Sequence, residues 1–405
     1  MNRPDRIKLY FKDTSFASLM TQRIYNILLV ASKYDAFTLE EDGRIDEQIF
    51  NEYTSLNLRY PPRFTLASTM KDAKDLLKAR SFELIIVMPS GDNSEVFELS
   101  KEFKSQRPSI PIVLLTPFSR EMFKKVFGHE DFTGIDYVFS WLGETDLLLA
   151  IVKLIEDKMN VDKDIASVGV QAILFIEDSI LFYSAILPYL YKHVFVQSRS
   201  FMTEALNDHE RMLRMRGRPK ILLARSYEEG LKLYDKYSKN ILGVVSDVRF
   251  PRNGVIDGEA GISLCSYIRS KDKFLPIIIE SSEDKNKPLA EEMGAYFINK
   301  NNETMHLELK DAVTTNFGFG DFNFINPENK EVVAVARNLR DLQDEIFTIP
   351  AESLFYHISH NHISRWLYSR AMFPLAEFLR GLVVKNINDI DEARKIIFDA
   401  IVTYR

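Results

Sequence analysis

Acidic side chains follow two short apolar runs of this chain, at the points where buried strands would end. Glu177 and Asp178 come directly after the run Ala172 to Ile176, and Asp247 follows the run Leu242 to Ser246. Because the carboxyl ends of parallel strands meet at one edge of a sheet, we expect these carboxylates to lie together. A hard divalent cation would offset their mutual repulsion, and oxygen ligands of this kind suit Mg2+. The sequence therefore predicts a magnesium site.

Two more polar residues stand at the ends of later apolar runs. Ser281 follows PIIIE and Lys300 follows YFIN, so we expect a hydroxyl and an ammonium at the same sheet edge. When a carboxylate attacks phosphorus in line, the charge on the transferring oxygens must be neutralised, by metal on one side and by an ammonium on the other. These residue types together are the ones that a phosphoryl-accepting site requires.

Short apolar runs alternate twice with helix-length amphipathic stretches, which is the pattern of strand and crossover helix in a parallel sheet. The strand-like runs of the first round are 25–31, 64–67, 84–88, 112–115 and 137–139. Those of the second round are 172–176, 221–224, 242–246, 277–279 and 296–298. We therefore predict an α/β fold with two doubly wound, five-stranded parallel sheets and a C-terminal helical segment. The connection between first and second strands is long in both rounds, so we expect extra helices there.

The two rounds are similar to each other, which indicates an internal duplication. ILLVAS (27–32) aligns with ILFIED (173–178), and IPIVLLT (110–116) aligns with LPIIIES (275–281). A polar helix end plus linker, EDKMNVDKDIASVGVQ, is expected between the rounds. The predicted parts are an N-terminal arm (1–24), a first sheet domain (25–158), a second sheet domain (170–315), a linker or hairpin (316–330) and a helical segment (331–405) broken at Pro350 and Pro374.

The second round resembles the receiver domain of response regulators, the phosphoaccepting module of two-component signalling. Receivers carry an acidic pair after the first strand, an acid after the third, a hydroxyl after the fourth and a lysine after the fifth. The polar residues described above stand in this order. The resemblance implies a flavodoxin-like fold, Mg2+ as the cofactor, and a sensor histidine kinase or phosphotransfer protein as the partner.

The resemblance also implies a role for each matching residue. Asp247 is then the phosphoacceptor, which takes the phosphoryl group from a phosphohistidine donor. Asp178, Asp247 and the backbone carbonyl of Arg249 ligate Mg2+, and Glu177 acts through a water molecule.

Lys300 and Ser281 bind the phosphoryl oxygens in this interpretation, and Ser281 forms a conformational switch with Phe297, three residues before the lysine. The chain departs from the receiver pattern at three places, one of which is the long stretch between Asp178 and Asp247. Asn301 replaces the usual proline after the lysine, and four extra residues, RNGV (252–255), follow the phosphoacceptor strand.

The first round has the strand pattern of a receiver without its chemistry. In the alignment, Ala31 and Ser32 replace the acidic pair, Met88 replaces the phosphoacceptor, Thr116 is retained and Ser140 replaces the lysine. A site without carboxylates cannot assemble Mg2+ or accept a phosphoryl group by this route. We therefore interpret this part as a pseudo-receiver that serves in packing, homodimer formation or partner docking.

The C-terminal segment concentrates three of the seven histidines, His357, His360 and His362. A metal site and a phosphotransfer histidine are two alternatives, but no Asp, Glu or Cys completes a recognised metal pattern. We favour an amphipathic helix that packs on the sheet domains.

The motif GFGDFNF and the helical pattern after it resemble the region that joins receivers to a phosphoenolpyruvate synthase or pyruvate phosphate dikinase-like enzyme in some bacterial proteins. This resemblance covers about the last quarter of the chain. It implies that the sequence is the N-terminal regulatory part of a longer, fused protein. None of that enzyme's catalytic segments is visible, so no separate enzymatic activity is predicted here.

Composition excludes several other classes. The chain has 405 residues, 52 basic and 58 acidic, and its net charge of -6 does not favour nucleic-acid binding. The single cysteine, Cys265, leaves no intramolecular disulfide framework and fits a reducing cytosol. No run approaches the roughly 18 apolar residues of a membrane span, so we expect a cytoplasmic protein without membrane partners.

Two alternatives to a phosphoaccepting receiver remain at this point. One is an interaction scaffold in which both receiver folds are silent. The other is an aspartate-nucleophile phosphatase acting on a small molecule, which is disfavoured because Arg249 stands where a second acid would follow Asp247.

Overall fold

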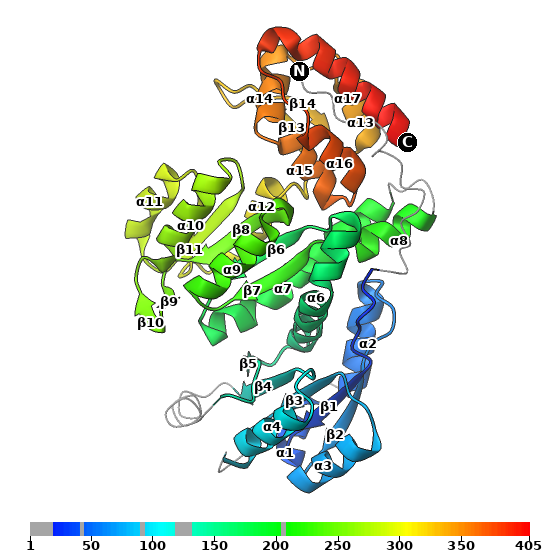
Figure 1. The fold of residues 1–405 in the computed structure, drawn as a ribbon, viewed down its shortest axis with the longest axis vertical. Coiled ribbons are helices and arrows are strands. Elements are labelled where there is room, and N and C mark those ends of the chain that lie inside the picture. The colour runs from blue at the N-terminus through cyan, green and yellow to red at the C-terminus, as the bar shows by residue number, and fades with distance from the viewer. Residues whose placement is uncertain (1–18, 41–43, 90–93, 118–131, 204–207) are drawn as a thin grey trace. The chain divides into compact units, whose positions relative to one another are not determined.

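The computed structural model describes residues 19–40, 44–89, 94–117, 132–203 and 208–405. It contains two parallel five-stranded sheets with flanking helices, followed by a segment made mainly of helices (Figure 1). The predicted fold class is therefore confirmed. The predicted N-terminal arm, 1–24, lies mostly outside the described residues.

The chain divides into two compact units, each of which contains one five-stranded sheet. Met20–Met159 and Asp178–Lys192 form one unit, and Asn160–Glu177 with His193–Arg405 forms most of the other. The division cuts through two long helices, because parts of α6 (Asp146–Val168) and of α7 (Ile180–Met202) fall in each unit.

All five strands predicted for the first sheet are present, in the spatial order β2-β1-β3-β4-β5. They are β1 (Asn26–Val30), β2 (Arg63–Ala67), β3 (Leu84–Val87), β4 (Ile112–Pro117) and β5 (Tyr137–Trp141). Their helices are α1 (Lys33–Leu39), α2 (Ile45–Ser55), α3 (Met70–Ala79), α4 (Ser94–Gln106) and α6 (Asp146–Val168). The strand order is that of a flavodoxin-like sheet, and strands buried on both faces read as continuous apolar runs, such as the fully buried LIIV of β3.

The second sheet repeats this topology, with the order β12-β11-β8-β6-β7 and parallel pairing throughout. Its strands are β6 (Ala172–Ile176), β7 (Lys220–Ala224), β8 (Ile241–Asp247), β11 (Ile277–Ser281) and β12 (Tyr296–Asn299). Its helices are α7 (Ile180–Met202), α8 (Asp208–Arg216), α9 (Tyr227–Tyr237), α10 (Ala260–Lys271), α11 (Lys287–Glu292) and α12 (Met305–Asn316), with short 3-10 turns at Ser238–Asn240 and Asp284–Asn286. The extra helices expected between first and second strands are α1 with α2, and α7 with α8.

The extra residues after the third strand of this sheet form a small hairpin. Strands β9 (Phe250–Arg252) and β10 (Val255–Asp257) pair antiparallel. Asn253 and Gly254 between them have positive φ angles of 53° and 76°. Asn-Gly is the dipeptide that favours a two-residue hairpin turn of this kind, so the insertion folds locally.

The polar stretch predicted as a helix end plus linker is mostly helix. Helix α6 continues to Val168, and only residues 169–171 separate it from β6. Nothing in the stretch breaks a helix before Gly169, whose φ of 78° suits the residue that follows a helix end. Asp164 near the end of α6 forms an ion pair of 2.9 Å with Lys220 of β7, and both side chains are fully buried.

The C-terminal segment begins with a second hairpin, in β13 (Phe322–Ile325) and β14 (Val332–Ala336). The range predicted as a linker or hairpin, 316–330, holds only β13 and the turn, because the hairpin extends to Ala336, and the prediction that 331–405 is helical is wrong at β14. That strand is rich in valine, a β-branched residue that fits a pleated sheet. The remaining elements are α13 (Leu339–Glu345), α14 (Ala351–Ser359), α15 (His362–Ser369), α16 (Phe373–Arg380), a 3-10 turn at Ile387–Asp389 and α17 (Ile390–Tyr404).

The two prolines act at helix starts, as their fixed φ angle favours. Pro350 caps α14 and Pro374 lies in the first turn of α16. Arg370 secures the loop before β13, donating to the carbonyl oxygens of Gly318 at 2.8 Å and Gly320 at 2.9 Å. Among the described helices, none is long and apolar enough to span a bilayer.

Gly243 of β8 should be irreplaceable because the Phe317 ring lies directly over it. A Cβ added at Gly243 would come within 2.2 Å of the ring, which is fully buried. We expect Gly243→Ala to lower the free energy of unfolding by about 1–3 kcal/mol, measured by urea denaturation. Gly258→Ala is the matched control, because an added Cβ there meets nothing within 4 Å. Equal stability of the two variants would contradict this account of the packing.

Candidate functional site

The polar residues predicted to meet at one sheet edge come from four strand ends of the second sheet. Glu177 and Asp178 follow β6, and Asp247 is the last residue of β8. Ser281 ends β11, and Lys300 follows β12. The order β12-β11-β8-β6 brings these ends side by side at the carboxyl edge, where open parallel sheets bind ligands.

Three carboxylates are close enough to share one cation. Glu177, Asp178 and Asp247 each offer an oxygen atom, and these atoms all lie within 4.8 Å of one another. Glu177 is fully buried, whereas Asp178 and Asp247 are partly exposed. In the part of the chain that is described, this is the one group of at least three such ligands. A compact set of hard oxygen donors, partly open to solvent, fits Mg2+, which keeps several of its waters.

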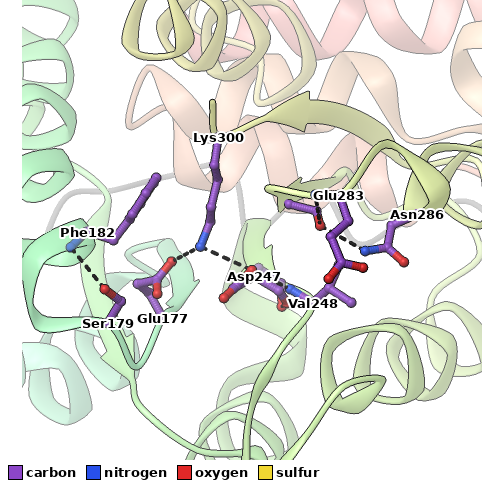
Figure 2. Close-up of polar contacts among 10 residues, drawn as sticks. Glu177, Ser179, Phe182, Asp247, Val248, Glu283, Asn286 and Lys300 are labelled. Atoms are coloured by element: carbon purple, nitrogen blue, oxygen red, sulfur yellow. Dashed lines mark hydrogen bonds and ion pairs between the residues drawn. The ribbon is translucent and has the colours of Figure 1, made fainter. Parts of the chain in front are cut away.

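Lys300 joins two of these carboxylates. Its Nζ lies 2.5 Å from Glu177 Oε2 and 3.1 Å from Asp247 Oδ1, as the dashed lines in Figure 2 show. Burial of the ammonium lowers its pKa, but the attraction of Glu177 and Asp247 outweighs that effect, and the net shift is upward. The lysine is therefore charged at neutral pH, and it compensates part of the negative charge at this edge.

Glu280 is a fourth carboxyl group at this edge that our sequence analysis did not single out. It is fully buried, and it stands directly opposite Asp247 in the register of β11 and β8, so both side chains point to the same face of the sheet. Neither of its carboxyl oxygens has a hydrogen-bond partner among the described residues. Burial raises the pKa of Glu280 to about 8, and the charges of Glu177 and Asp247 act in the same direction, against Lys300. The signal in the sequence was an acid inside the apolar run PIIIES.

Ser281 is buried, and the turn that follows it holds its hydroxyl group. The Ser281 Oγ accepts hydrogen bonds from the Glu283 backbone N–H at 3.1 Å and from Asn286 Nδ2 at 2.8 Å. Phe297 is partly buried against the core of this sheet. Because Phe297 pairs with Ile279, two residues before Ser281, Phe297 and Ser281 share one face. The predicted switch pair is thus on one side of the sheet.

The backbone after Asp247 depends on a close approach by α10. The Gly261 N–H donates to the Val248 carbonyl oxygen at 2.9 Å. A Cβ on Gly261 would lie 2.0 Å from the carbonyl oxygen of Asp247, so only glycine permits this contact. Arg249, whose carbonyl is a predicted ligand, is exposed in the turn that follows.

Asn301, which replaces the proline expected after the lysine, fixes its loop by hydrogen bonds. Its backbone N–H donates to Asn299 Oδ1 at 2.8 Å, and its side-chain Nδ2 donates to the Ser282 carbonyl oxygen at 2.8 Å. The Lys300 backbone N–H also donates to the Ser281 carbonyl oxygen, at 2.9 Å. These bonds hold the base of the lysine side chain next to the end of β11.

The corresponding edge of the first sheet is used differently. Ser32 caps α1, because its Oγ accepts the Asp35 backbone N–H at 3.1 Å. Met88 is buried, and the backbone N–H of the buried Ser140 donates to Ser184 Oγ at 3.0 Å. The residues aligned with the acidic pair, the phosphoacceptor and the lysine thus form a helix cap and packing contacts.

No protein-family model matches the chain, and none of the curated proteins searched matches it. Solved structures do match. Two are of proteins described as a two-component system response regulator/GGDEF domain protein. Their chains are 17% and 16% identical to this one, with TM-scores of 0.29 and 0.30, and each match covers 71% of this chain and 96% of the solved chain. A third, NtrX from Brucella abortus in complex with ADP, is 12% identical with a TM-score of 0.27, over 95% of this chain and 83% of that one.

Glu280 should make the stability of the second-sheet unit depend on pH. Folding raises the pKa of Glu280 from 4.5 to about 8. At a pH between these two values, the carboxyl group keeps its proton in the folded chain and loses it in the unfolded chain. The free energy of unfolding therefore falls as the pH rises through this window. We expect Glu280→Gln, which cannot ionise, to unfold at a higher urea concentration than the parent at pH about 8 without Mg2+, and at a similar one at pH about 5.

The matched control for this measurement is Glu303→Gln, at an exposed position in the turn before α12. It should follow the parent at both pH values. If Glu280→Gln also followed the parent at pH about 8, the buried carboxyl would not titrate as described.

Proposed function

We propose that the second-sheet domain, predicted at 170–315, is a phosphoaccepting receiver. The observation that carries this proposal is the Lys300 ammonium, held between Glu177 and Asp247 at the edge where three carboxylates converge. A buried cation beside a metal-binding acidic group is what a carboxylate needs to receive a phosphoryl group.

The proposed reaction is a phosphoryl transfer to Asp247. A carboxylate oxygen of Asp247 attacks phosphorus, an O–P bond forms, and the N–P bond of a phosphohistidine donor breaks, leaving a neutral imidazole after protonation. Lys300 shifts from Asp247 towards a phosphoryl oxygen while it keeps its contact with Glu177. The Ser281 hydroxyl supplies a further hydrogen bond once it leaves Asn286 and the Glu283 N–H.

Mg2+ would be held by Asp178, Asp247 and the Arg249 carbonyl, with Glu177 acting through water. When bound, this ion neutralises charge on the phosphoryl oxygens opposite the ammonium. The carboxylate spacing of this chain supports that ligand set. The rearrangement of Ser281 and Phe297 would then report the phosphorylated state to a partner surface.

In this proposal the first-sheet domain is a pseudo-receiver that serves in packing, dimer formation or partner docking. The phosphoryl donor is a sensor histidine kinase or a phosphotransfer protein. A fused phosphoenolpyruvate synthase-like enzyme remains a prediction from the resemblance of the C-terminal segment alone. The competing function is a silent receiver-fold scaffold. The phosphatase alternative gains no support, because the position where it needs a second acid is occupied by Arg249, an exposed turn residue.

Phosphorylation at Asp247 can be measured directly by intact mass. After incubation with Mg2+ and acetyl phosphate, we expect one added phosphoryl group on the parent chain. Asp247→Asn should gain none, because an amide is not a nucleophile for phosphorus, and omission of Mg2+ should also prevent the gain. Labelling of the Asn variant would show that the phosphoacceptor is another residue.

The scaffold alternative is tested in the same samples by calorimetric titration with Mg2+. If the parent neither labels nor binds Mg2+, the site is silent and the scaffold function stands. If it binds Mg2+ and Asp178→Asn weakens that binding, the ligand set is supported independently of the choice of phosphodonor.

A further inference from the structure

A cavity of about 1290 Å³ lies in the unit of the second sheet, away from the acidic edge. It is lined by residues of α10, α12, the β13–β14 hairpin, α14 and α15, and by Leu275 and Pro276 just before β11. The cavity lies next to the start of β11, whereas the acidic residues stand at the carboxyl ends of the strands of the second sheet. The cavity is therefore a second, separate feature. Its size exceeds the roughly 300–1,000 Å³ of most small-molecule sites, so a small organic ligand has ample room.

Arg365 brings a poorly compensated charge to this cavity. Its Nη2 donates to the Phe274 carbonyl oxygen at 2.8 Å, and it forms no ion pair with any described residue. Burial lowers the pKa of Arg365 to about 10, and repulsion from Arg380 and Arg269 adds to this effect, against the attraction of Asp272. The guanidinium is still charged at neutral pH, and most of its N–H groups have no protein acceptor in the described part of the chain.

Two further cations line the same cavity. Arg269 donates to the carbonyl oxygens of Met293 at 3.0 Å and Leu275 at 2.8 Å, which hold the guanidinium in place without neutralising it. Lys273, Glu292 and Asp321 also line the cavity, but all three are exposed to solvent, where a charge is well screened. The partly buried charges of the cavity are therefore those of Arg269 and Arg365.

A pair of histidines adds a directed hydrogen-bond donor. The Ile325 backbone N–H donates to His357 Nε2 at 3.0 Å, so the proton of the neutral His357 must be on Nδ1. His357 Nδ1 lies 3.0 Å from His362 Nδ1 and therefore donates to it. His362 then carries its own proton on Nε2, which has no partner among the described residues, and its ring lines the cavity.

The assigned tautomers also argue against a metal site or a phosphotransfer role at His357 and His362. Burial lowers the pKa of His357 to about 4 and that of His362 further, so both rings are neutral. A nitrogen that carries a proton offers no lone pair to a metal ion or to phosphorus. His362 therefore faces the cavity as a donor, and the three histidines form no metal-binding group in the described structure.

The remaining walls of the cavity are aromatic. Phe274, Phe322, Tyr356 and Trp366 line it, beside the Met293 side chain. Such walls bury the apolar body of a ligand, while a few convergent polar groups orient its charged end. Here the polar groups that converge are cations and an N–H donor.

We propose that this cavity binds a small organic anion, in which a phosphate or carboxylate group is carried on a planar apolar body. Arg365 and His362, three residues apart on α15, lie on one face of that helix and both donate to the anion. A guanidinium matches the two oxygens of either group, and the aromatic walls pack on the body of the ligand. The site does not depend on phosphorylation of Asp247.

The experiment is calorimetric titration of the whole chain, without Mg2+, with phenyl phosphate, benzoate and phenol. We expect phenyl phosphate or benzoate to bind at least about tenfold more tightly than phenol, and the tighter of the two identifies the anion class. The same ligand should shift the His362 Nε2–H resonance in the unmodified chain. Absence of both binding and shift would overturn the proposal, whether or not any variant folds.

Arg365→Gln should weaken anion binding by at least about tenfold and leave phenol binding unchanged. Arg340→Gln is the matched control, because Arg340 is an exposed arginine of α13, and it should bind like the parent. Asp247→Asn should also bind normally, which separates this site from the proposed receiver. Unchanged affinity in a folded Arg365→Gln variant would place the anion elsewhere and refute the site.

Discussion

The acidic edge of the second sheet depends on one ionic contact, the Lys300 ammonium between Glu177 and Asp247. Parallel topology forces the strand ends together, and in this chain those ends carry acids. Without a cation, buried Glu177 beside Asp247 would be costly in a medium of low dielectric constant. The lysine compensates part of this charge, and the spacing of the three carboxylates leaves room for a metal ion to compensate the rest. Stability and the proposed chemistry therefore depend on the same charges.

Glu280 adds a second constraint to that edge. A carboxyl group with no hydrogen-bond partner in the described structure favours its neutral form, and its neighbours Glu177 and Asp247 strengthen that preference. A divalent cation among the acids would oppose it by lowering the local negative potential. Metal binding and the protonation state of Glu280 are therefore coupled through ordinary electrostatics, even though Glu280 is not among the proposed ligands.

The two sheets show that topology alone does not define a site. Both have the same strand order, yet one edge gathers acids and a lysine while the other has Ser32 as a helix cap and a buried Met88. Within the second unit, opposite ends of the strands also differ in charge. The carboxyl end is acidic, whereas the partly buried charges that line the cavity before β11 are those of Arg269 and Arg365. Function on this fold follows from the side chains at particular positions.

The sequence by itself determined the strands of both sheets, because each is a short apolar run bounded by polar residues, and burial on both faces leaves that pattern in the chain. It also determined which acids and which lysine would meet, since strand order in a doubly wound sheet fixes the ends that are neighbours. Local patterns were less decisive where helix and strand compete. The valines of β14 became a strand because β13 offered a pairing edge, and α6 continued through a polar stretch that contains no helix breaker.

Only the tertiary structure decided the features that depend on contacts between distant residues. The isolation of Glu280, the acceptor role of Ser281 and the close approach of Gly261 to Asp247 follow from packing that no local pattern encodes. The same is true of the His357–His362 pair, whose tautomers are set by a backbone N–H more than thirty residues away, at Ile325. Spacing in the sequence suggested a metal site or a packed helix face, and only the hydrogen-bond geometry showed that His362 is a donor at a cavity.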